Sequence, residues 1–333
     1  MESAATPTPS RVSASRLSQH PLARFAARRL ISLVVILIAL VFATFMMTRL
    51  IPGDPAVNVA GIGATQEEID RIRRELLLDR PLPEQLSIYV TNLARGDLGQ
   101  SFFTRQPVSQ LITQRIGTSL QLAAAALAIV MIISIPLGII VGAFTRERRH
   151  PRAEVSFTAV TSVLGSLPEF LAATVLAFIF AVWLRLLPVA GSAGWEALVL
   201  PALAVSIRPA AILSRIVRVE TLNTLASDFI RTARGKRMPG RIIYNRHTLP
   251  NVVTAALTVG GLLFAGIIGG AVVVENVFAR PGLGSSLVQA VLVRDYPVVQ
   301  GVVLVLGVIV VVVNALVDLL LAAIDPRTAA GKV

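Results

Sequence analysis

Six long apolar stretches, separated by polar segments, dominate the pattern of this chain. They cover residues 30–48, 118–144, 157–184, 197–217, 252–274 and 298–324. An α-helix rises about 1.5 Å per residue, so each stretch is long enough to cross a hydrocarbon layer about 30 Å thick. The pattern therefore predicts an all-α membrane protein with six transmembrane helices.

The segment between the first two stretches has the composition of a soluble domain. Thr65 and Glu68 have the spacing of a capping box, and apolar residues follow Glu68 at helical intervals. We expect residues 51–116 to form a helical insert outside the cytoplasm. Two compatible roles are a cap over the outer ends of the spans and a contact surface for an extracytoplasmic partner.

A short charged segment, Asp228–Arg237, lies between the fourth and fifth stretches. With 100° per residue, a helix here has one apolar face and one polar face. The apolar face holds Leu225, Ala226, Phe229 and Ala233, and the polar face holds Ser227, Arg231 and Arg234. A membrane protein has little reason to leave an apolar face in water, so this segment is predicted to dock a soluble partner.

Composition agrees with a membrane protein, and the charge distribution predicts its orientation. Apolar residues make up 54% of the 333 residues, charged residues make up 15%, and the mean hydropathy is +0.74. The net charge is +12, and 20 basic against 6 acidic residues fall in segments 1–29, 144–156, 208–250 and 325–333. The positive-inside rule places these segments, and both termini, in the cytoplasm. No nucleic-acid-binding motif accompanies the charge, so nucleic acid is not expected as a partner.

The order of polar and apolar segments predicts the domain organisation. The first apolar stretch is too long for a signal peptide and lacks a clear cleavage site, so residues 24–50 are expected to form a retained span. Residues 1–23 are expected to be a disordered cytoplasmic tail, and 328–333 a second tail. Residues 117–327 form the transmembrane core, which includes the amphipathic helix at 226–240.

Several ionisable or polar residues lie inside the apolar stretches, where they are costly and often functional. Glu169 follows a proline, Arg208 precedes one, and Asp318 lies one turn after Asn314. A proline frees a backbone carbonyl and bends its helix, which suits a moving pathway. The alternative interpretation is that each charge lies near the headgroups or neutralises another charge inside the bundle.

Glu275, at the outer end of the fifth stretch, precedes a segment rich in turn-forming residues. Phe278 follows it, and then Pro281-Gly-Leu-Gly284. This pattern predicts a tight re-entrant or capping turn. The turn is either simple loop structure or an outer gate that faces an extracytoplasmic partner.

Residue types and motifs that the sequence lacks reduce the number of possible functions further. The chain has no cysteine and three histidines far apart in sequence, so a metal site is not expected. Its two lysines, Lys236 and Lys332, are not in a phosphate-binding loop, and no nucleophile–base arrangement is recognisable. The chain is therefore predicted to be no enzyme and to bind no cofactor. Active transport would take its energy from another subunit or from an ion gradient.

A series of short motifs resembles one family over residues 24–327. The chain is similar to the first (B-type) permease subunit of the dipeptide, oligopeptide and nickel ATP-binding-cassette (ABC) importers. The matching segments, in order, are Ile51–Ala56, Arg95–Ser101, Ser166–Phe170, Leu187–Pro188 with Gly191, Asp228–Arg237, Arg246–His247, Glu275–Gly284, Arg294–Pro297, Asn314 with Asp318, and Asp325–Arg327.

The resemblance implies a type I ABC importer permease fold in which the charged segment is the EAA-type coupling helix. Asp228 matches the motif's acidic position, and Thr232-Ala233 its pair of small residues. The residues implied in docking a cytoplasmic ATPase are Asp228, Phe229, Ile230, Arg231, Thr232, Ala233, Arg234, Gly235 and Arg237.

The chain also departs from the family pattern at three positions. Arg237 stands where the family usually has glycine, so the bend that ends the helix is expected nearer Gly235 or at Pro239-Gly240. Pro250 replaces a frequent basic residue and Ala255 a frequent proline. The fifth span is therefore expected to kink earlier than in the family.

The resemblance also implies partners, location and substrate. The partners are a second similar permease, two ATPase subunits that bind ATP and Mg²⁺, and an extracytoplasmic substrate-binding protein, at a bacterial plasma membrane. The absence of extracytoplasmic histidine and cysteine favours di- or oligopeptides over nickel or another small solute. An ion-coupled secondary transporter and a membrane-embedded enzyme are the rival classes. The first lacks an internal repeat, and the second lacks catalytic residues.

Overall fold

The computed structural model describes residues 21–324 apart from 51–53, 62, 76 and 192–193. Within these residues the chain is helical, and its one β-bridge is the isolated pair Gln100–Pro107. The tails expected at 1–23 and 328–333 lie outside the described residues, except that helix α1 already begins at Pro21.

Long helices alternate with short ones along the described chain. The long helices are α1 (Pro21–Leu50), α5 (Val108–Phe144), α8 (Glu196–Ala226), α11 (Leu249–Val277) and α13 (Tyr296–Ile324). The short α-helices are α2 (Pro55–Ala60), α3 (Gln66–Glu75), α4 (Leu82–Ala94), α6 (Pro151–Ser166), α7 (Glu169–Leu176), α9 (Asp228–Gly235), α10 (Gly240–Ile242) and α12 (Leu283–Leu292). A 3₁₀ turn, η2 (Arg146–Arg148), precedes α6, and the π-helical segments are η3 (Ala177–Trp183) and η4 (Ile243–Thr248).

Four of the described helical segments are long and apolar enough to cross a membrane. They are α5, α8, α13 and the continuous segment Gly240–Val277, which contains α11. The bent pair of α6 with α7–η3 is a fifth if it is counted as one span, and the apolar part of α1, Ile31–Met47, is shorter. The described residues thus contain four or five such spans. The expected count of six, with its first span at 24–50, stays a prediction.

The third apolar stretch, expected as a continuous span at 157–184, is broken. Helix α6 and the α7–η3 segment meet at an angle of 98°. Leu167 is extended, with φ −70° and ψ 122°, because the following Pro168 disfavours the helical conformation there. The helix that contains the second stretch is longer than expected. Helix α5 begins at Val108, inside the expected insert, and not at residue 118.

Helices α5 and α8 make the closest packing in the bundle. A Cβ atom on Gly138 of α5 would lie 2.4 Å from Cγ1 of Val217, and one on Gly142 would lie 2.9 Å from Thr221. Glycines four residues apart lie on one helix face, so their small size lets α8 approach the α5 backbone. The glycine- and alanine-rich composition of the second stretch therefore reflects helix packing.

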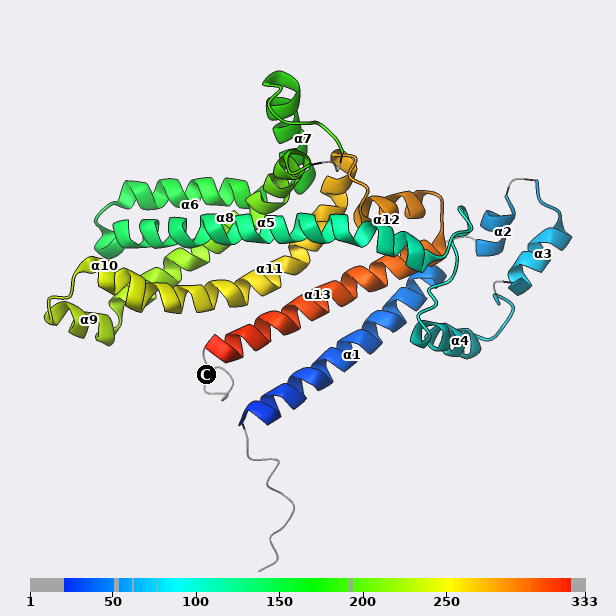
Figure 1. The fold of residues 1–333 in the computed structure, drawn as a ribbon, viewed down its shortest axis with the longest axis horizontal. Coiled ribbons are helices and arrows are strands. Elements are labelled where there is room, and N and C mark those ends of the chain that lie inside the picture. The colour runs from blue at the N-terminus through cyan, green and yellow to red at the C-terminus, as the bar shows by residue number, and fades with distance from the viewer. Residues whose placement is uncertain (1–20, 51–53, 62, 76, 192–193, 325–333) are drawn as a thin grey trace, which may run out of the picture.

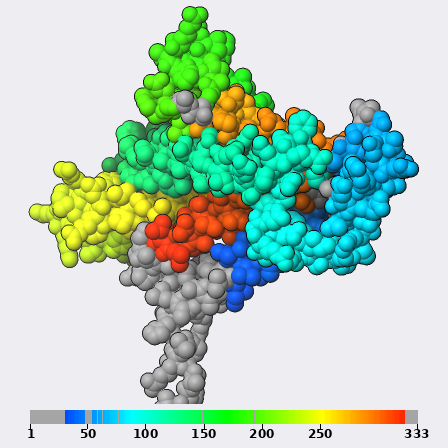
Figure 2. All heavy atoms as spheres, turned by 45° about the vertical axis from the view of Figure 1, so that its right-hand side comes forward, coloured from blue at the N-terminus to red at the C-terminus, as the bar shows by residue number. Residues whose placement is uncertain are grey.

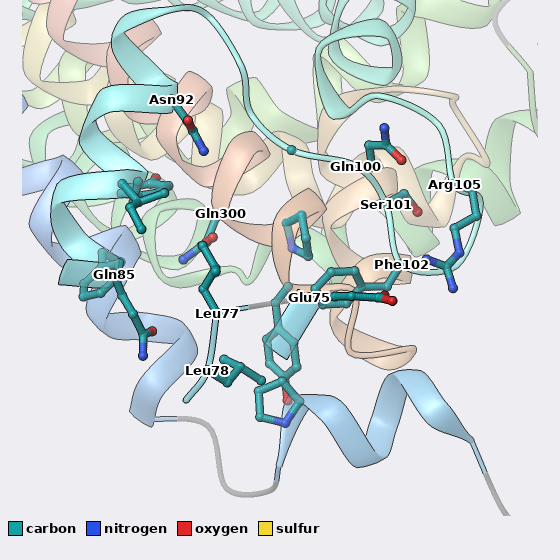
Figure 3. A pocket seen from close by; sticks show the side chains of 17 residues that line it. Glu75, Leu77, Leu78, Gln85, Asn92, Gln100, Ser101, Phe102, Arg105 and Gln300 are labelled. Carbon is teal, nitrogen blue, oxygen red and sulfur yellow. The ribbon is translucent and has the colours of Figure 1, made fainter. Parts of the chain in front are cut away.

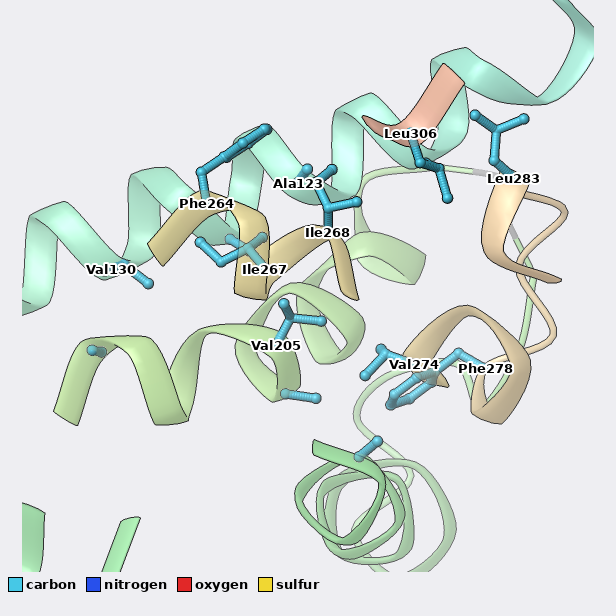
Figure 4. Close-up of a cluster of buried hydrophobic side chains, with 14 of the residues drawn as sticks. Ala123, Val130, Val205, Phe264, Ile267, Ile268, Val274, Phe278, Leu283 and Leu306 are labelled. Atoms are coloured by element: carbon cyan, nitrogen blue, oxygen red, sulfur yellow. The ribbon is translucent and has the colours of Figure 1, made fainter. Parts of the chain in front are cut away.

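The main buried cluster joins α5, α8, α11 and α13 (Figure 4). Val130, Val205 and Ile267 are among its fully buried members, and Phe278 and Leu283 extend it toward α12. Without a difference in polarity between helix surfaces and lipid tails, this contact is stabilised mainly by van der Waals packing.

The polar connections of the bundle sort to two sides. In Figure 1, the start of α1, the end of α13, the α5–α6 connection and α9–α10 lie toward one end of the long axis. The insert helices α2, α3 and α4 lie at the other end. Figure 2 shows the α9–α10 region (yellow) and the insert (blue to cyan) projecting at opposite ends, with the region around α7 (green) projecting between them. The described parts of segments 1–29 and 144–156, and the part of segment 208–250 that follows α8, thus share a side, whereas segment 325–333 lies outside the described residues.

The insert begins with two short helices, and the second of them, α3, has the capping box that its sequence predicts. The backbone N–H of Thr65 donates to Oε2 of Glu68 (3.0 Å), and the N–H of Glu68 donates to the Thr65 hydroxyl (3.4 Å). The Thr65 hydroxyl also donates to Oε2 of Glu68 (3.2 Å), and the two bonds that Thr65 donates to this carboxylate lower the pKa of Glu68. Asp54 caps α2 by accepting the N–H of Ala56 (2.9 Å) and also pairs with Arg73 of α3, which ties the two helices together.

A cavity of about 400 Å³ lies where the insert meets the end of α1 and the start of α13 (Figure 3). Tyr89 of α4 packs against Phe45 of α1, with ring centroids 5.8 Å apart, and its hydroxyl lies 3.3 Å from Oγ1 of Thr44. Burial of this hydroxyl raises the pKa of Tyr89. Helix α4 therefore packs against the end of α1, and a role of residues 51–116 as a cap stays a prediction.

Candidate coupling surface and path residues

Helix α9, the expected coupling helix, is a separate short helix that begins directly after α8. Ser227 is extended, with ψ 154°, and separates the end of α8 at Ala226 from the start of α9 at Asp228. An acidic residue in the first turn and Arg234 in the last turn both suit the helix dipole. The helix covers 228–235, which is shorter than the expected 226–240.

The faces of α9 differ from the expected pattern because Ser227 interrupts the helix. Ile230 and Ala233 point inward and pack with Leu225, Ile243 and Met238 in a cluster of their own. Ile230 has no exposed surface. The expectation that Ile230 and Ala233 contact an ATPase is therefore wrong for this conformation, since the chain itself covers both side chains.

Phe229 is the apolar side chain that α9 leaves exposed. It is 49% exposed, and its ring centroid lies 6.4 Å from that of His247 in η4. Arg231 and Asp228 form an ion pair of 3.4 Å whose side chains are 82% and 94% exposed. Thr232 and Gly235 are also exposed, and Arg234 is half-buried. The outward surface of α9 is thus one aromatic ring among charged groups.

The end of α9 lies at Arg237, in the conformation that favours glycine. Arg237 has a φ of +57°, whereas Gly235 is an ordinary helical residue. The N–H of Arg237 donates to the carbonyl of Arg234 (2.8 Å), and that of Met238 donates to the carbonyl of Ala233 (3.2 Å). These two bonds form a Schellman motif with the left-handed residue at its usual place. The expected shift of the bend to Gly235 or to Pro239-Gly240 is therefore wrong.

The segment that leads into the fifth span is irregular, as its departures from the family pattern predict. Residues Ile243–Thr248 form a π-helix, and the hydroxyl of Thr248 donates to the carbonyl of Ile243 (3.2 Å). Pro250, at the start of α11, has no N–H for the preceding turn, so an irregular turn before it fits this sequence. Ala255 lies in regular helix beyond it.

Glu169 and Arg208, two of the expected path residues, form an ion pair. Nη1 of Arg208 lies 3.1 Å from Oε1 of Glu169, and the side chains are 51% and 24% exposed, respectively. The pair joins the start of α7, just after the bend, to the centre of α8. A Cβ atom on Gly270 would lie 3.2 Å from Cγ of Glu169, so this glycine leaves room for the Glu169 side chain against α11.

Glu275, the expected turn or gate residue, is fully buried near the C-terminal end of α11. Its carboxylate accepts hydrogen bonds from the Ser119 hydroxyl (2.6 Å) and from the N–H groups of Gly284 (2.8 Å) and Ser285 (3.1 Å). It therefore binds the start of α12 to α5 and α11. A Cβ atom on Gly282 would lie 2.3 Å from the carboxylate, so a side chain there is excluded.

Arg280 is the positive charge beside Glu275. It is 2% exposed, and its Nη1 donates to the carbonyl of Ala197 (3.2 Å) at the start of α8. Burial lowers the pKa of Arg280, and the Glu275 carboxylate opposes that shift. This buried charged cluster fixes the start of α12 and the start of α8 to one another.

Asn314 and Asp318, the last expected path residues, lie half-buried on α13. A Cβ atom on Gly261 of α11 would lie 3.4 Å from Oδ1 of Asn314. Asn314 therefore lies in the contact between α11 and α13, which favours a packing role.

Sequence reasoning did not find several polar contacts that connect distant helices. The Ser101 hydroxyl donates to Asp295, Arg218 of α8 pairs with Glu154 of α6 (2.8 Å), and Ser119 holds Glu275. The partners are between 64 and 194 residues apart, and single serines carry no local pattern. The charged residues among them could have been found from the sequence, because a charge next to an apolar stretch needs a partner.

The geometry defines a class of protein: a multi-pass helical membrane component with a short, partly exposed amphipathic helix, α9, on one side. Residues 134–330 match the family described as "binding-protein-dependent transport system inner membrane component", and residues 22–123 match its N-terminal component. The chain belongs to this family of inner-membrane transport components. The resemblance to ABC importer permeases that the motifs suggested is thereby confirmed.

Curated relatives and a solved structure agree with this assignment. A putative peptide transport system permease protein of Brucella suis is 39% identical over 308 residues, which cover 90% of this chain and 97% of the relative. A glutathione transport system permease protein of Pectobacterium atrosepticum is 37% identical over 299 residues, covering 90% and 96%. The inward-facing MetNI methionine ABC transporter matches in fold, with a TM-score of 0.52 and 16% identity over 65% of this chain and 97% of that chain.

Proposed function

We propose that this chain is a membrane-spanning permease subunit of an ABC importer for di- and oligopeptides, and that it forms half of the translocation path. The relatives named for peptide and glutathione transport support the peptide class. The other half of the path comes from a second, similar permease. Peptides reach the path from a substrate-binding protein on the outer side, next to the insert.

The docking site for a cytoplasmic ATPase is α9, and the single observation that carries this proposal is the exposed ring of Phe229. The rest of the apolar surface of α9 is covered by the chain itself, so Phe229 is the apolar anchor left for a partner. Burial of its exposed half contributes about 1–2 kcal/mol. Asp228 and Arg231 lie at the rim, where exposed charges contribute less than about 1 kcal/mol each.

The orientation follows from the charge pattern and the docking site together. The side that carries α9, the start of α1 and the end of α13 faces the cytoplasm, because the basic segments gather there. ATP and Mg²⁺ bind to two ATPase subunits on this side, and the chain has no nucleotide site of its own. Both termini lie in the cytoplasm, and the insert faces outward.

Movement passes from the ATPases to the path through α9. Ile230 and Ala233 anchor α9 to the end of α8 and to η4, which continues into α11. A displacement of α9 therefore moves both α8 and α11. ATP-dependent closure of the ATPases then favours one of two arrangements of the spans over the other. The path is exposed alternately to the outer and the inner side.

Reconstitution tests this proposal. Vesicles that contain both permeases and the ATPases, with the binding protein outside, are expected to accumulate a radiolabelled tripeptide only when ATP is present inside. Phe229→Ala is expected to lower uptake and copurification of the ATPase, whereas Arg231→Ala has a smaller effect. Uptake without the ATPases, or ATP-dependent uptake of Ni²⁺ in place of peptide, would contradict the proposal.

A further inference from the structure

Arg208 is a charged group near the middle of the most enclosed helix of the bundle. It follows the first residue of α8, Glu196, by 12 positions, which is about 18 Å along the helix axis. Between Ala197 and Arg218, Arg208 is the one exposed residue of α8, and all the remaining residues in this range are buried or half-buried. The fold therefore opens the surface of this helix at one point, and a guanidinium occupies that point.

The guanidinium uses little of its binding capacity within the chain. Arginine carries five N–H donors, and the recorded partner of Arg208 among the described residues is one carboxylate oxygen, reached through Nη1. An exposed charge at this depth is unfavourable against lipid tails, so this face borders water or protein. The remaining donors are available to a ligand with acceptor oxygens.

The neighbouring surface leaves space for such a ligand. Glu169 lies against Gly270 of α11, and Gly266 and Gly269 are exposed on the same helix. A Cβ atom added to Gly266 or Gly269 would meet no other atom within 4 Å. Helix α11 thus has a small residue next to Glu169, and open space at two glycines within about one turn of it.

We propose that Arg208 is a carboxylate-binding subsite of the peptide path, and that Glu169 occupies it when no peptide is present. The inference rests on the proposed function as a peptide permease. Planar bidentate pairing with a carboxylate is the interaction that arginine forms best. The C-terminal carboxylate is common to peptides of any sequence, so a contact with it does not restrict the side chains that pass. Exchange of Glu169 for this carboxylate leaves the charge around Arg208 balanced at every stage.

Saturation-transfer NMR with trialanine and its C-terminal amide tests the subsite. The sample is the complex of both permeases and the ATPases in lipid nanodiscs, without the binding protein, so the observed binding is that of the path. The complex is expected to bind trialanine about tenfold more tightly than the amide, since a charge-assisted pair is lost with the amide. Arg208→Gln is expected to remove this preference, and Arg208→Lys to keep part of it.

Glu169→Gln separates a subsite from a merely structural ion pair. It frees Arg208 from its internal competitor, so trialanine is expected to bind more tightly than in the unaltered complex, while binding of the amide stays constant. The matched control is Arg152→Gln, an exposed arginine at the far end of α6, which is expected to change neither affinity.

Three results would overturn the subsite. They are equal or undetectable binding of trialanine and its amide, unchanged preference in Arg208→Gln, and weaker trialanine binding in Glu169→Gln. If these occur while vesicles still take up peptide with ATP, the subsite fails and the proposed function stands. If uptake of peptide is absent as well, the proposed function fails too.

Discussion

Two charged regions lie at the opposite ends of α11 and differ in almost every physical respect. At the outer end, Glu275 and Arg280 are buried, and each is held by groups from other helices. Before the inner end, Asp228 and Arg231 of α9 are highly exposed, and their recorded ion pair is with each other. The outer region is covered by the chain itself, whereas the inner region leaves its charged groups open to a partner.

The apolar side chains next to the two charged regions differ in burial in the same way. The outer cluster includes Phe278 and Leu283, which are buried with the main core. The inner region leaves Phe229 half exposed, although the adjacent Ile230 is fully covered. Changes in the outer region should therefore alter folding, and changes on the outward side of α9 should alter assembly.

Removal of the outer carboxylate is expected to give the largest effect. Glu275→Ala leaves Arg280 buried without its neighbouring charge, and the donors of Ser119, Gly284 and Ser285 without an acceptor. The loss of stability is about 3–5 kcal/mol, measured by thermal unfolding of the solubilised chain. Glu196→Ala, at an exposed position on α8, is the control and should change stability little. A loss below about 1 kcal/mol for Glu275→Ala would contradict the structural role of the cluster.

Adjacent residues on α9 are expected to give opposite results. Ile230→Ala removes a buried side chain and should destabilise the chain by about 2–5 kcal/mol. Phe229→Ala should leave the unfolding temperature nearly constant and weaken ATPase binding by about 1–2 kcal/mol. Unfolding by circular dichroism and ATPase binding by surface plasmon resonance separate the two quantities. If Phe229→Ala destabilised the isolated chain as much as Ile230→Ala, the division between the two faces would be wrong.

The end of α9 gives a smaller and more local test. Arg237 has a positive φ that costs a residue with a side chain more than glycine, so Arg237→Gly is expected to raise stability by up to about 1 kcal/mol. Gly235→Ala is the matched change, and it should also stabilise, because Gly235 is helical and exposed. Destabilisation by Gly235→Ala in thermal unfolding would place the bend at Gly235 instead.

The ion pair of Asp54 with Arg73 is more exposed than Glu275 and Arg280 and less exposed than the pair on α9, since both of its side chains are about one-third exposed. The hydrogen bond from Arg73 lowers the pKa of Asp54, so its stabilising effect is present above the unfolded pKa of about 3.9. The effect is lost as the pH falls through the folded pKa.

Asp54→Asn is therefore expected to cost less than about 1 kcal/mol at pH 7, and a smaller amount at pH 3. Hydrogen exchange of α2 and α3 at both pH values measures this difference. Asp79→Asn, at an exposed position after α3, is the control. A cost that is the same at both pH values would show that the charge of Asp54 does not matter.

Local patterns in the sequence predicted local structure well. The capping box of Thr65 and Glu68 forms, because both partners lie within one helical turn. The short helix at 228–235 forms where its charge pattern indicated. Glu169 and Arg208 were marked as charges that need an explanation, but their pairing could not be predicted, because the two residues are 39 positions apart and lie on different helices.

Features that depend on long-range packing could not be predicted. A periodic pattern tells which residues of a helix share a face, but it does not tell whether the same chain covers that face, as it covers Ile230. The 98° bend after α6 was signalled by Pro168, but its size depends on the neighbouring helices. Arg237 shows that a left-handed helix end does not require glycine when two backbone hydrogen bonds hold it.

The central claim is that a partner ATPase covers Phe229, and cysteine labelling tests it directly. The chain has no cysteine, so Phe229→Cys carries the single reactive thiol. The account predicts that maleimide labelling slows at least about tenfold when the ATPase subunits are bound. Val90→Cys, on an exposed face of the insert, should then be labelled at an unchanged rate. Equal labelling of Phe229→Cys with and without the ATPases would contradict the account.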